Sequence, residues 1–258
     1  MVKCFSPKEA TGVRFPQPLQ RELINMWWNI TALAFGVSTL ISLYITVRAF
    51  FVWKRDLDNT IGQIFAHIFI FLTLYMGIRA FVSFLFPASP SILSGAYIMS
   101  HVFLGIGAAY VAKLGLTPVA RPIIAQSVFL LFVILFALDV GLTLLLPNSP
   151  SFDSAHNIID WGTNEVVGIF HTMLLWSTFL LSAGIFLFKT VQCWRDPLLR
   201  YRFLLISLSL VFAILIVIPR NIFHTPGFIF VSDVGFAVSF FLALWGISWG
   251  EEKHEFLK

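Results

Sequence analysis

Seven apolar runs, each longer than 20 residues, dominate this chain of 258 residues. An α-helix rises 1.5 Å per residue, so each run is long enough to cross the roughly 30 Å hydrocarbon core of a membrane. Only 12% of the residues are charged, whereas a soluble domain carries about a quarter. The sequence therefore excludes a water-soluble globular enzyme and predicts an all-α integral membrane protein with a seven-transmembrane-helix bundle.

Prolines mark several boundaries between the runs, where a residue without an N–H group is tolerated. No alternating ten-residue pattern typical of a membrane β-barrel is present. The predicted organisation is an N-terminal tail (1–23), a transmembrane domain (24–250) and a short tail (251–258). The expected spans are 22–52, 60–86, 90–113, 121–146, 164–189, 199–219 and 226–249.

Lysine and arginine are distributed unevenly between the connections, which sets the predicted orientation. The second, fourth and sixth loops hold one basic residue, Arg220. The first, third and fifth loops and the C-terminal tail hold eleven: Arg48, Lys54, Arg55, Lys113, Arg121, Lys189, Arg195, Arg200, Arg202, Lys253 and Lys258. The positive-inside rule then predicts an N-terminus outside and a C-terminus inside, although four basic residues in the N-terminal tail pull against it.

Partner classes follow from the charge pattern. No cluster of five basic residues occurs, so the net charge of +4 does not point to nucleic acid. Cys4 and Cys193 lack the spacing of a disulfide framework or a metal motif. No Gly-x-Ser-x-Gly, Walker or CxxC motif occurs, so an enzyme is not favoured. The expected surroundings are membrane lipids in the plasma membrane, an unknown small ligand and a protein partner.

Ionisable residues inside the spans are rare and costly, at about 2.5–3.5 kcal/mol on insertion scales, and often mark function. Five of them lie at a similar depth of about 10–16 Å from the predicted outer helix ends. They come from five different spans: Arg79, His101, Asp139, His171 and Asp233. His67 alone belongs to the inner half. The shared depth predicts one polar level in the outer half of the bundle.

Helical spacing adds polar neighbours to this level. Asn164 and His171 share a face with Thr178 and Ser182, and Tyr97 lies one turn before His101. The functional interpretation is an outward-facing polar crevice that binds a ligand through Arg79, Tyr97, His101, Asp139, Asn164, His171 and Asp233. The structural alternative is that Arg79 forms an ion pair with Asp139 or Asp233, while the histidines only hydrogen-bond between helices.

Several cofactors can be weighed on these residues. His101 and His171 could hold a bis-histidine haem, or with Asp139 and Asp233 a zinc ion, but no local ligand spacing supports either. Retinal bound as a Schiff base is nearly excluded, because no lysine lies between Pro226 and Glu251. No cofactor is therefore predicted.

Two loops carry further polar residues. Asp153, His156 and Asp160 in the fourth loop are either a cation site or, more commonly, solvated surface. Arg220 and His224 in the sixth loop either guide an anion to the crevice or anchor at lipid headgroups, and the second is the usual case.

The segment from Thr31 to Arg121 resembles the seven-helix sensor modules that precede bacterial histidine kinases. The shared pattern is a first helix dotted with polar residues, the basic loop Trp53-Lys54-Arg55, an aromatic second helix, a very short loop and a third helix of small residues. The resemblance implies a seven-helix fold and a sensory role, and it assigns no individual site residue. No kinase follows Trp249, so signalling would require a partner.

These observations predict a receptor-like or sensor-like membrane protein that takes a small ligand and acts through a partner. Two alternatives remain open at this point. One is a membrane subunit of a redox or metal-dependent complex centred on His101 and His171. The other is a component resembling a permease.

Overall fold

The computed structural model describes residues 29–56, 58–146 and 148–248. Seven of its helices are long and apolar enough to cross a membrane, with α7 continuing through two irregular segments. The elements are α2 (Ile30–Arg55), α3 (Thr60–Leu85), α4 (Pro90–Leu116), α5 (Pro122–Leu145), β1 (Ser151–Asp153), β2 (Ile158–Asp160), α6 (Glu165–Gln192), α7 (Pro197–Phe212), the π-helix η1 (Ala213–Val217), the 3-10 helix η2 (Ile218–Asn221) and α8 (Pro226–Ser248).

The predicted all-α seven-helix class is confirmed, and most span bounds differ by only a few residues. The first helix begins at Ile30, and the predicted residues 22–28 of that span lie outside the described residues, as do the two tails. The fourth loop differs from the expectation because it contains a short hairpin. Its register pairs Ser151 with Asp160, Phe152 with Ile159 and Asp153 with Ile158.

Local sequence explains where the helices begin. Pro90, Pro122 and Pro197 occupy the first turns of α4, α5 and α7, where the missing N–H is not needed. The side chain of Asn29 accepts a hydrogen bond from the Ala32 amide (2.7 Å) and caps α2. Asn59 caps α3 in the same way, through the amide of Gly62.

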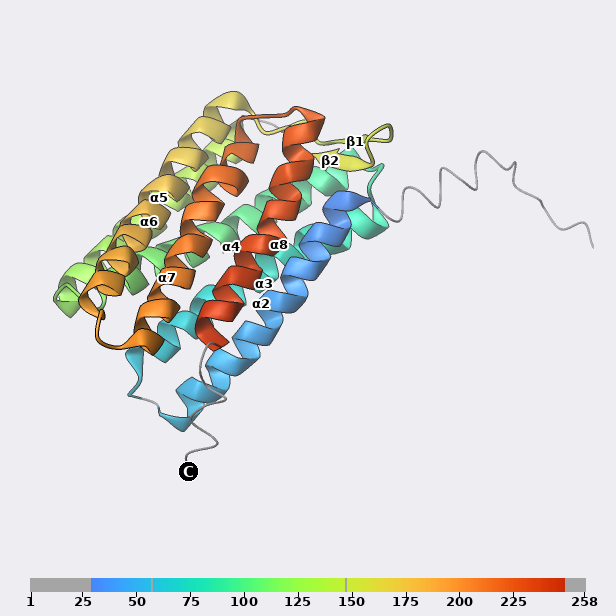
Figure 1. Ribbon diagram of the computed structural model, residues 1–258. Coiled ribbons are helices and arrows are strands. Elements are labelled where there is room, and N and C mark those ends of the chain that lie inside the picture. Colours follow the sequence, from blue (N-terminus) through green and yellow to red (C-terminus); the bar gives the residue numbers. More distant parts are fainter. Residues whose placement is uncertain (1–28, 57, 147, 249–258) are drawn as a thin grey trace, which may run out of the picture.

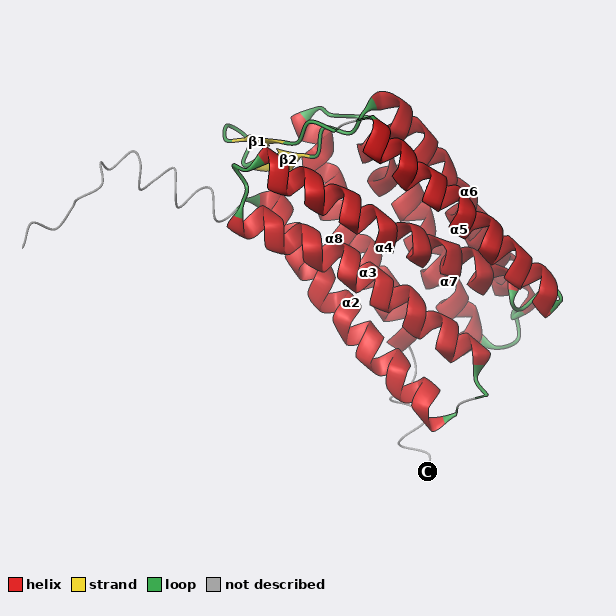
Figure 2. Ribbon diagram, turned by 180° about the vertical axis from the view of Figure 1, so that it is seen from behind, coloured by secondary structure: helices red, strands yellow, loops and turns green. Residues whose placement is uncertain are grey.

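Six helices form a closed ring, in the order α2, α3, α4, α6, α7 and α8, with α8 packing back against α2 (Figure 1). Helix α5 stands outside this ring and packs on α4 and α6. The view from behind shows the same arrangement, with the hairpin at one end of the bundle (Figure 2). The main hydrophobic core lies inside the ring and includes Phe35, Phe69, Leu104, Leu175 and Phe240.

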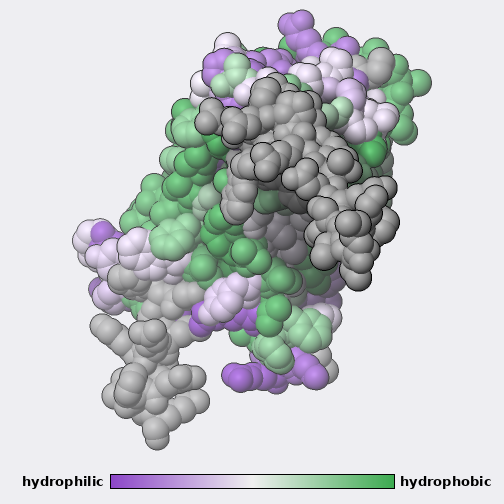
Figure 3. Space-filling view, turned by 90° about the vertical axis from the view of Figure 1, so that its right-hand side faces the viewer, coloured by the Kyte–Doolittle hydropathy of each residue, from purple (hydrophilic) through white to green (hydrophobic). Residues whose placement is uncertain are grey.

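On the face that Figure 3 shows, an apolar band lies between two polar ends. Leu40, Ile123 and Leu145 are among the most exposed large apolar side chains of the bundle, with Leu145 78% exposed. Such a belt suits lipid, because a soluble monomer rarely exposes so large an apolar surface. The chain is therefore a multi-pass membrane protein.

The two ends of the bundle differ in charge. We call the end that carries β1 and β2 the hairpin end, and the opposite end the basic end. The basic end collects the helix termini that carry Arg48, Lys54, Arg55, Lys113, Arg121, Lys189, Arg195, Arg200 and Arg202. This grouping agrees with the alternation predicted from the loops, and the orientation across the membrane stays a prediction.

Candidate functional site

Arg79 lies near the hairpin end of α3 and is buried, with 2% of its surface exposed. Its Nε donates a hydrogen bond to Ser100 Oγ (3.0 Å). Its Nη2 lies 3.4 Å from His101 Nδ1, but that nitrogen also lies 2.9 Å from the Tyr97 carbonyl, which can only accept. The guanidinium carbon sits 4.5–5.7 Å from four ring centroids: Phe35, Tyr75, Tyr97 and Trp161.

The structural alternative, an ion pair between Arg79 and Asp139 or Asp233, is wrong. In the described part of the chain, no carboxylate lies within ion-pair distance of Arg79; Asp139 instead bonds His171, and Asp233 pairs with Arg220. Depth along a span places residues at one level but does not determine which helices are neighbours. The cation is instead surrounded by aromatic faces, each worth about 0.5–2 kcal/mol as a cation–π contact.

Asp139 and His171 form a buried pair between α5 and α6, joined by a hydrogen bond from His171 Nδ1 to Asp139 Oδ2. The His101 ring lies beside His171, with centroids 4.4 Å apart and the planes tilted by 58°. Both Nδ1 atoms are engaged, whereas the Nε2 atoms of His101 and His171 are buried without a hydrogen-bond partner. Among the described residues, two imidazole nitrogens on neighbouring rings thus lack a hydrogen-bond partner.

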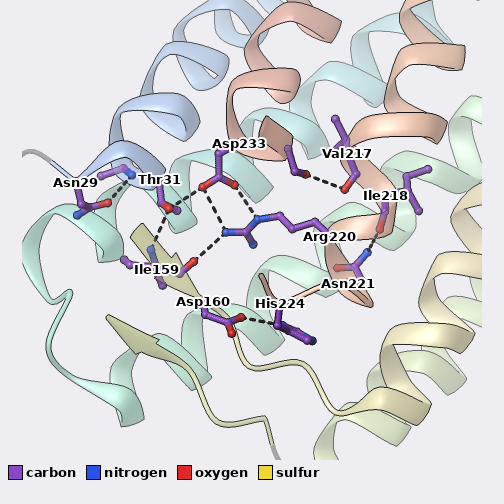
Figure 4. Close-up of polar contacts among 12 residues, drawn as sticks. Asn29, Thr31, Ile159, Asp160, Val217, Ile218, Arg220, Asn221, His224 and Asp233 are labelled. Atoms are coloured by element: carbon purple, nitrogen blue, oxygen red, sulfur yellow. Dashed lines mark hydrogen bonds and ion pairs between the residues drawn. The ribbon is translucent and has the colours of Figure 1, made fainter. Parts of the chain in front are cut away.

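Arg220 and Asp233 form a second buried pair, with Nε 2.7 Å from Oδ1 (Figure 4). Thr31 donates to Asp233 Oδ2 (2.6 Å) and accepts from the Ile159 amide (3.0 Å). Arg220 Nη2 also donates to the Ile159 carbonyl (2.9 Å). The network therefore joins α2, β2, η2 and α8 at the hairpin end.

The expectation that Arg220 is a loop residue at the headgroups is wrong, because it is only 7% exposed. The π-helix η1 and the 3-10 helix η2 extend α7 toward the hairpin end and direct Arg220 inward. Carbonyls in these segments accept side-chain donors: Trp176 bonds Ile214 (3.1 Å) and Ser232 bonds Val217 (3.2 Å). Irregular backbone of this kind is tolerated at membrane depth only where such partners or a cavity are present.

The hairpin covers this polar level. Trp161, which follows β2, is 2% exposed and packs with Ile159, Leu93 and Tyr97 in a second hydrophobic cluster. The Tyr97 hydroxyl donates to Thr163 Oγ1 (2.9 Å). The predicted outward-facing crevice is therefore wrong in one respect: its charged and histidine residues are at most 2% exposed and form a closed layer.

Two glycines allow the hairpin end to pack closely. Gly162 has a φ of +55°, and a Cβ there would lie 2.1 Å from the Ser149 carbonyl oxygen. Gly168 in α6 meets η2 so closely that a Cβ would lie 2.2 Å from the Asn221 carbonyl oxygen. Neither position accommodates a side chain without movement of backbone.

The less common alternative for the fourth loop, a cation site formed by Asp153, His156 and Asp160, is not assembled. Asp153 bonds His156 (2.7 Å), and this hydrogen bond lowers the pKa of the Asp153 carboxyl. Asp160 instead contacts His224 (2.9 Å), as Figure 4 shows. Within residues 29–56, 58–146 and 148–248, no three His, Cys, Asp or Glu side chains are grouped to hold a metal ion. The four candidate zinc ligands His101, His171, Asp139 and Asp233 do not form one group either, because Asp233 is paired with Arg220.

The remaining predicted residues have local roles. Asn164 caps α6 by accepting from the Val166 amide (3.1 Å), and its side chain is half-buried. His67 lies away from the polar level, as expected, and stacks on Tyr110 with centroids 5.0 Å apart.

A pocket with a volume of about 110 Å³ lies inside the ring of helices. Its walls are mainly apolar, and they include Phe69, Leu72, Leu104, Leu175, Phe236 and Phe240. Arg79, Tyr75, Arg220 and Asn221 line its hairpin end. Of the predicted crevice residues, only Arg79 lines this pocket. Sequence reasoning named Arg220 as a loop residue but missed its burial and its pairing with Asp233.

The sequence matches no protein-family model, and no curated protein is significantly similar to it. The fold and the buried site define a seven-helix integral membrane protein with an internal pocket. Its chemistry has to be inferred from the residues themselves.

Proposed function

We propose that this chain is a receptor-like membrane protein that binds a small ligand inside its ring of helices and acts through a protein partner. The observation that supports the proposal is the apolar pocket of about 110 Å³ inside the bundle, which has Arg79 and Arg220 at one end. Ligand sites are typically concave and mostly apolar, and they carry a few polar groups, as this pocket does. Placement in the plasma membrane with the hairpin end outside is part of the same proposal.

The pocket also contacts the irregular part of the seventh span. Ala213, Val217 and Ile218 of η1 and η2 line it, and π-helical segments occur frequently at functional sites. A ligand touching these turns would favour one arrangement of α7 over another. In the proposal, the change in the arrangement of α7 extends to the basic end, where α7 begins, and the partner binds the two arrangements with different affinity.

Binding of tritiated dodecanol to the full chain in nanodiscs of neutral lipid tests the proposal, with empty nanodiscs as the blank. Ala243 lines the pocket, so Ala243→Trp should fill it and abolish specific binding. Leu145→Trp adds the same side chain at a position 78% exposed on the outer surface and should leave binding unchanged. Binding that is equal in both variants, or no greater than in empty nanodiscs, would contradict the proposal.

The histidine pair favours a second candidate, a metal-binding subunit of a redox complex. A histidine that binds a metal usually donates its other ring N–H to a carboxylate or a backbone carbonyl. His171 does so to Asp139 and His101 to the Tyr97 carbonyl, and both leave Nε2 free. A metal–nitrogen bond of about 2 Å places imidazoles across a porphyrin farther apart than the 4.4 Å between these centroids, so a single ion fits better than haem.

Metal analysis of the purified protein after incubation with Zn²⁺ or Cu⁺ tests this second candidate. One ion per chain in the natural sequence and none in His101→Phe or His171→Phe would support it. Equal metal content in all three proteins would reject it. His67→Phe serves as a control, because His67 lies away from the pair.

A further inference from the structure

Within the part of the chain that the structure describes, the groups that touch Arg79 do not balance its charge. Its hydrogen-bond acceptor is the neutral Ser100 hydroxyl, and the aromatic rings around it carry no net charge. Both carboxylates of the polar level are engaged elsewhere, Asp139 with His171 and Asp233 with Arg220. A buried cation is expensive unless an anion or several acceptors compensate it. Arg79 thus has capacity for one more negatively charged partner.

Arg79 is also part of the pocket wall, at the same end as Arg220. Asp233 already compensates Arg220, so the hairpin end of the pocket carries about one excess positive charge. Tyr75 lies beside it, with the Arg79 guanidinium carbon 4.8 Å from its ring centroid. This end of the pocket favours an anionic group and disfavours a cation.

The rest of the pocket is long and apolar. Phe65, at its other end, is 14 residues before Arg79 on α3, which corresponds to about 21 Å along the helix. Leu72, Leu104, Phe236 and Phe240 line the space between them. Ser209 and Ser239 also line it, but they hydrogen-bond each other's carbonyl groups (2.8 and 3.0 Å) and so present little free polarity. An alkyl chain suits such walls, at about 0.8 kcal/mol per buried CH₂ group.

We infer that the pocket binds an amphiphile with one negatively charged head group and an unbranched alkyl chain. The head group contacts Arg79 at the hairpin end, and the chain extends toward Phe65 and the basic end. This inference rests on the proposed function, since it names the ligand class of the same pocket. A carboxylate and a phosphate share the chemistry that Arg79 recognises, so the source is either a fatty acid or a single-chain phospholipid.

Four ligands with the same alkyl chain test the inference on the full chain in neutral nanodiscs: dodecanoate, dodecyl phosphate, dodecanol and dodecylamine. The charged contact is expected to make at least one anion bind about thirtyfold more tightly than dodecanol, since a buried charge pair is worth about 2 kcal/mol or more. Dodecylamine should bind most weakly. A preference for dodecanoate over dodecyl phosphate points to a fatty acid, and the reverse points to a phospholipid.

Variants locate the head group. Arg79→Gln should reduce anion binding about thirtyfold while dodecanol binding is unchanged, whereas Arg79→Lys should retain most of the preference. Ala243→Trp should weaken the anions and dodecanol together, because it blocks the space for the chain. If Arg79→Gln binds none of the four ligands, the relative affinities of these ligands for the natural protein test the inference instead.

The outcomes separate the two proposals. Equal binding of dodecanoate, dodecyl phosphate and dodecanol to the natural protein overturns the inference and leaves the proposed function intact. Tightest binding of dodecylamine overturns it as well. Binding of no ligand above empty nanodiscs overturns both. Anion preference that survives unchanged in Arg79→Gln overturns the placement of the head group and with it the inference.

Discussion

Arg220 and Asp233 form a buried ion pair between η2 and α8, in which Nε lies 2.7 Å from Oδ1. Thr31 and the carbonyl of Ile159 add hydrogen bonds to Asp233 and Arg220 respectively. This pair has two effects on the site. It attaches the hairpin to the ends of the helices, and it engages the carboxylate that Arg79 would otherwise attract.

Removing one partner of this pair should destabilise the protein strongly. Arg220→Gln or Asp233→Asn leaves one buried charge uncompensated, which costs about 3–5 kcal/mol in the free energy of unfolding. The double variant should recover part of this loss. Reversible unfolding in mixed micelles measures all three, and a coupling energy of at least about 1 kcal/mol is expected.

The matched control is a cycle between Arg220→Gln and Asp139→Asn, since these two residues share no partner. Their effects should add within about 0.5 kcal/mol. Coupling between Arg220 and Asp233 no larger than in this control would show that the pair is not formed.

Gly162→Ala should disturb the hairpin end. The substitution places a Cβ 2.1 Å from the Ser149 carbonyl oxygen at a φ of +55°, and strain of this type costs about 1–3 kcal/mol. We expect faster hydrogen exchange of the Ile158 to Trp161 amides and lower thermal stability. Gly95→Ala is the control, because no atom lies within 4 Å of its added Cβ, and it should not destabilise. Unchanged exchange in Gly162→Ala would contradict the packing described for the hairpin.

Asp139→Leu should destabilise the contact between α5 and α6. The substitution leaves the Nδ1 of His171 buried without an acceptor, at a cost of about 1–3 kcal/mol in the free energy of unfolding. Thr143→Val is a suitable comparison one turn away, since Thr143 bonds only the Asp139 carbonyl of its own helix. Thermal unfolding should therefore shift much more in Asp139→Leu than in Thr143→Val, and equal shifts would argue against the pair.

The orientation of the bundle can be measured with introduced cysteines, in a background where Cys4 and Cys193 are replaced by serine. Ser154 in the hairpin and Asp58 between α2 and α3 are both exposed and lie at opposite ends. With the hairpin end outside, an impermeant thiol reagent should label Ser154→Cys in intact cells and spare Asp58→Cys. Both sites should react after the membrane is made permeable. Labelling of Asp58→Cys alone would invert the orientation.

The sequence was sufficient for the helices and for the depth of the polar residues. Hydropathy and prolines place α3 and α4 within a few residues of their observed ends, and Arg79, His101 and His171 do converge. Pairing could not be predicted in the same way, because depth is one coordinate and the neighbours depend on the order of helices around the ring. Asp139 meets His171 because α5 packs against α6.

The burial of Arg220 was not predicted, for a different reason. Its position in the sequence, after Pro219 and before a polar stretch, is typical of a loop. The π and 3-10 turns continue the span by nine residues beyond α7 and turn this arginine toward Asp233. Likewise, a hairpin with three residues in each strand gives almost no periodic signal.

The hydrogen bond between Thr31 and Asp233 joins residues 202 positions apart in the chain. At a synthesis rate of about 5–20 residues per second, Thr31 leaves the ribosome about 10–40 s before its acceptor does. Until Asp233 is made, the Thr31 hydroxyl lacks this acceptor, and Arg220, which precedes Asp233 by 13 residues, lacks its counter-ion for roughly the last 1–3 s. Assembly of the hairpin end must therefore wait for insertion of the last span, and a nascent chain arrested between Arg220 and Asp233 would present an unpaired arginine to the quality-control machinery of the membrane.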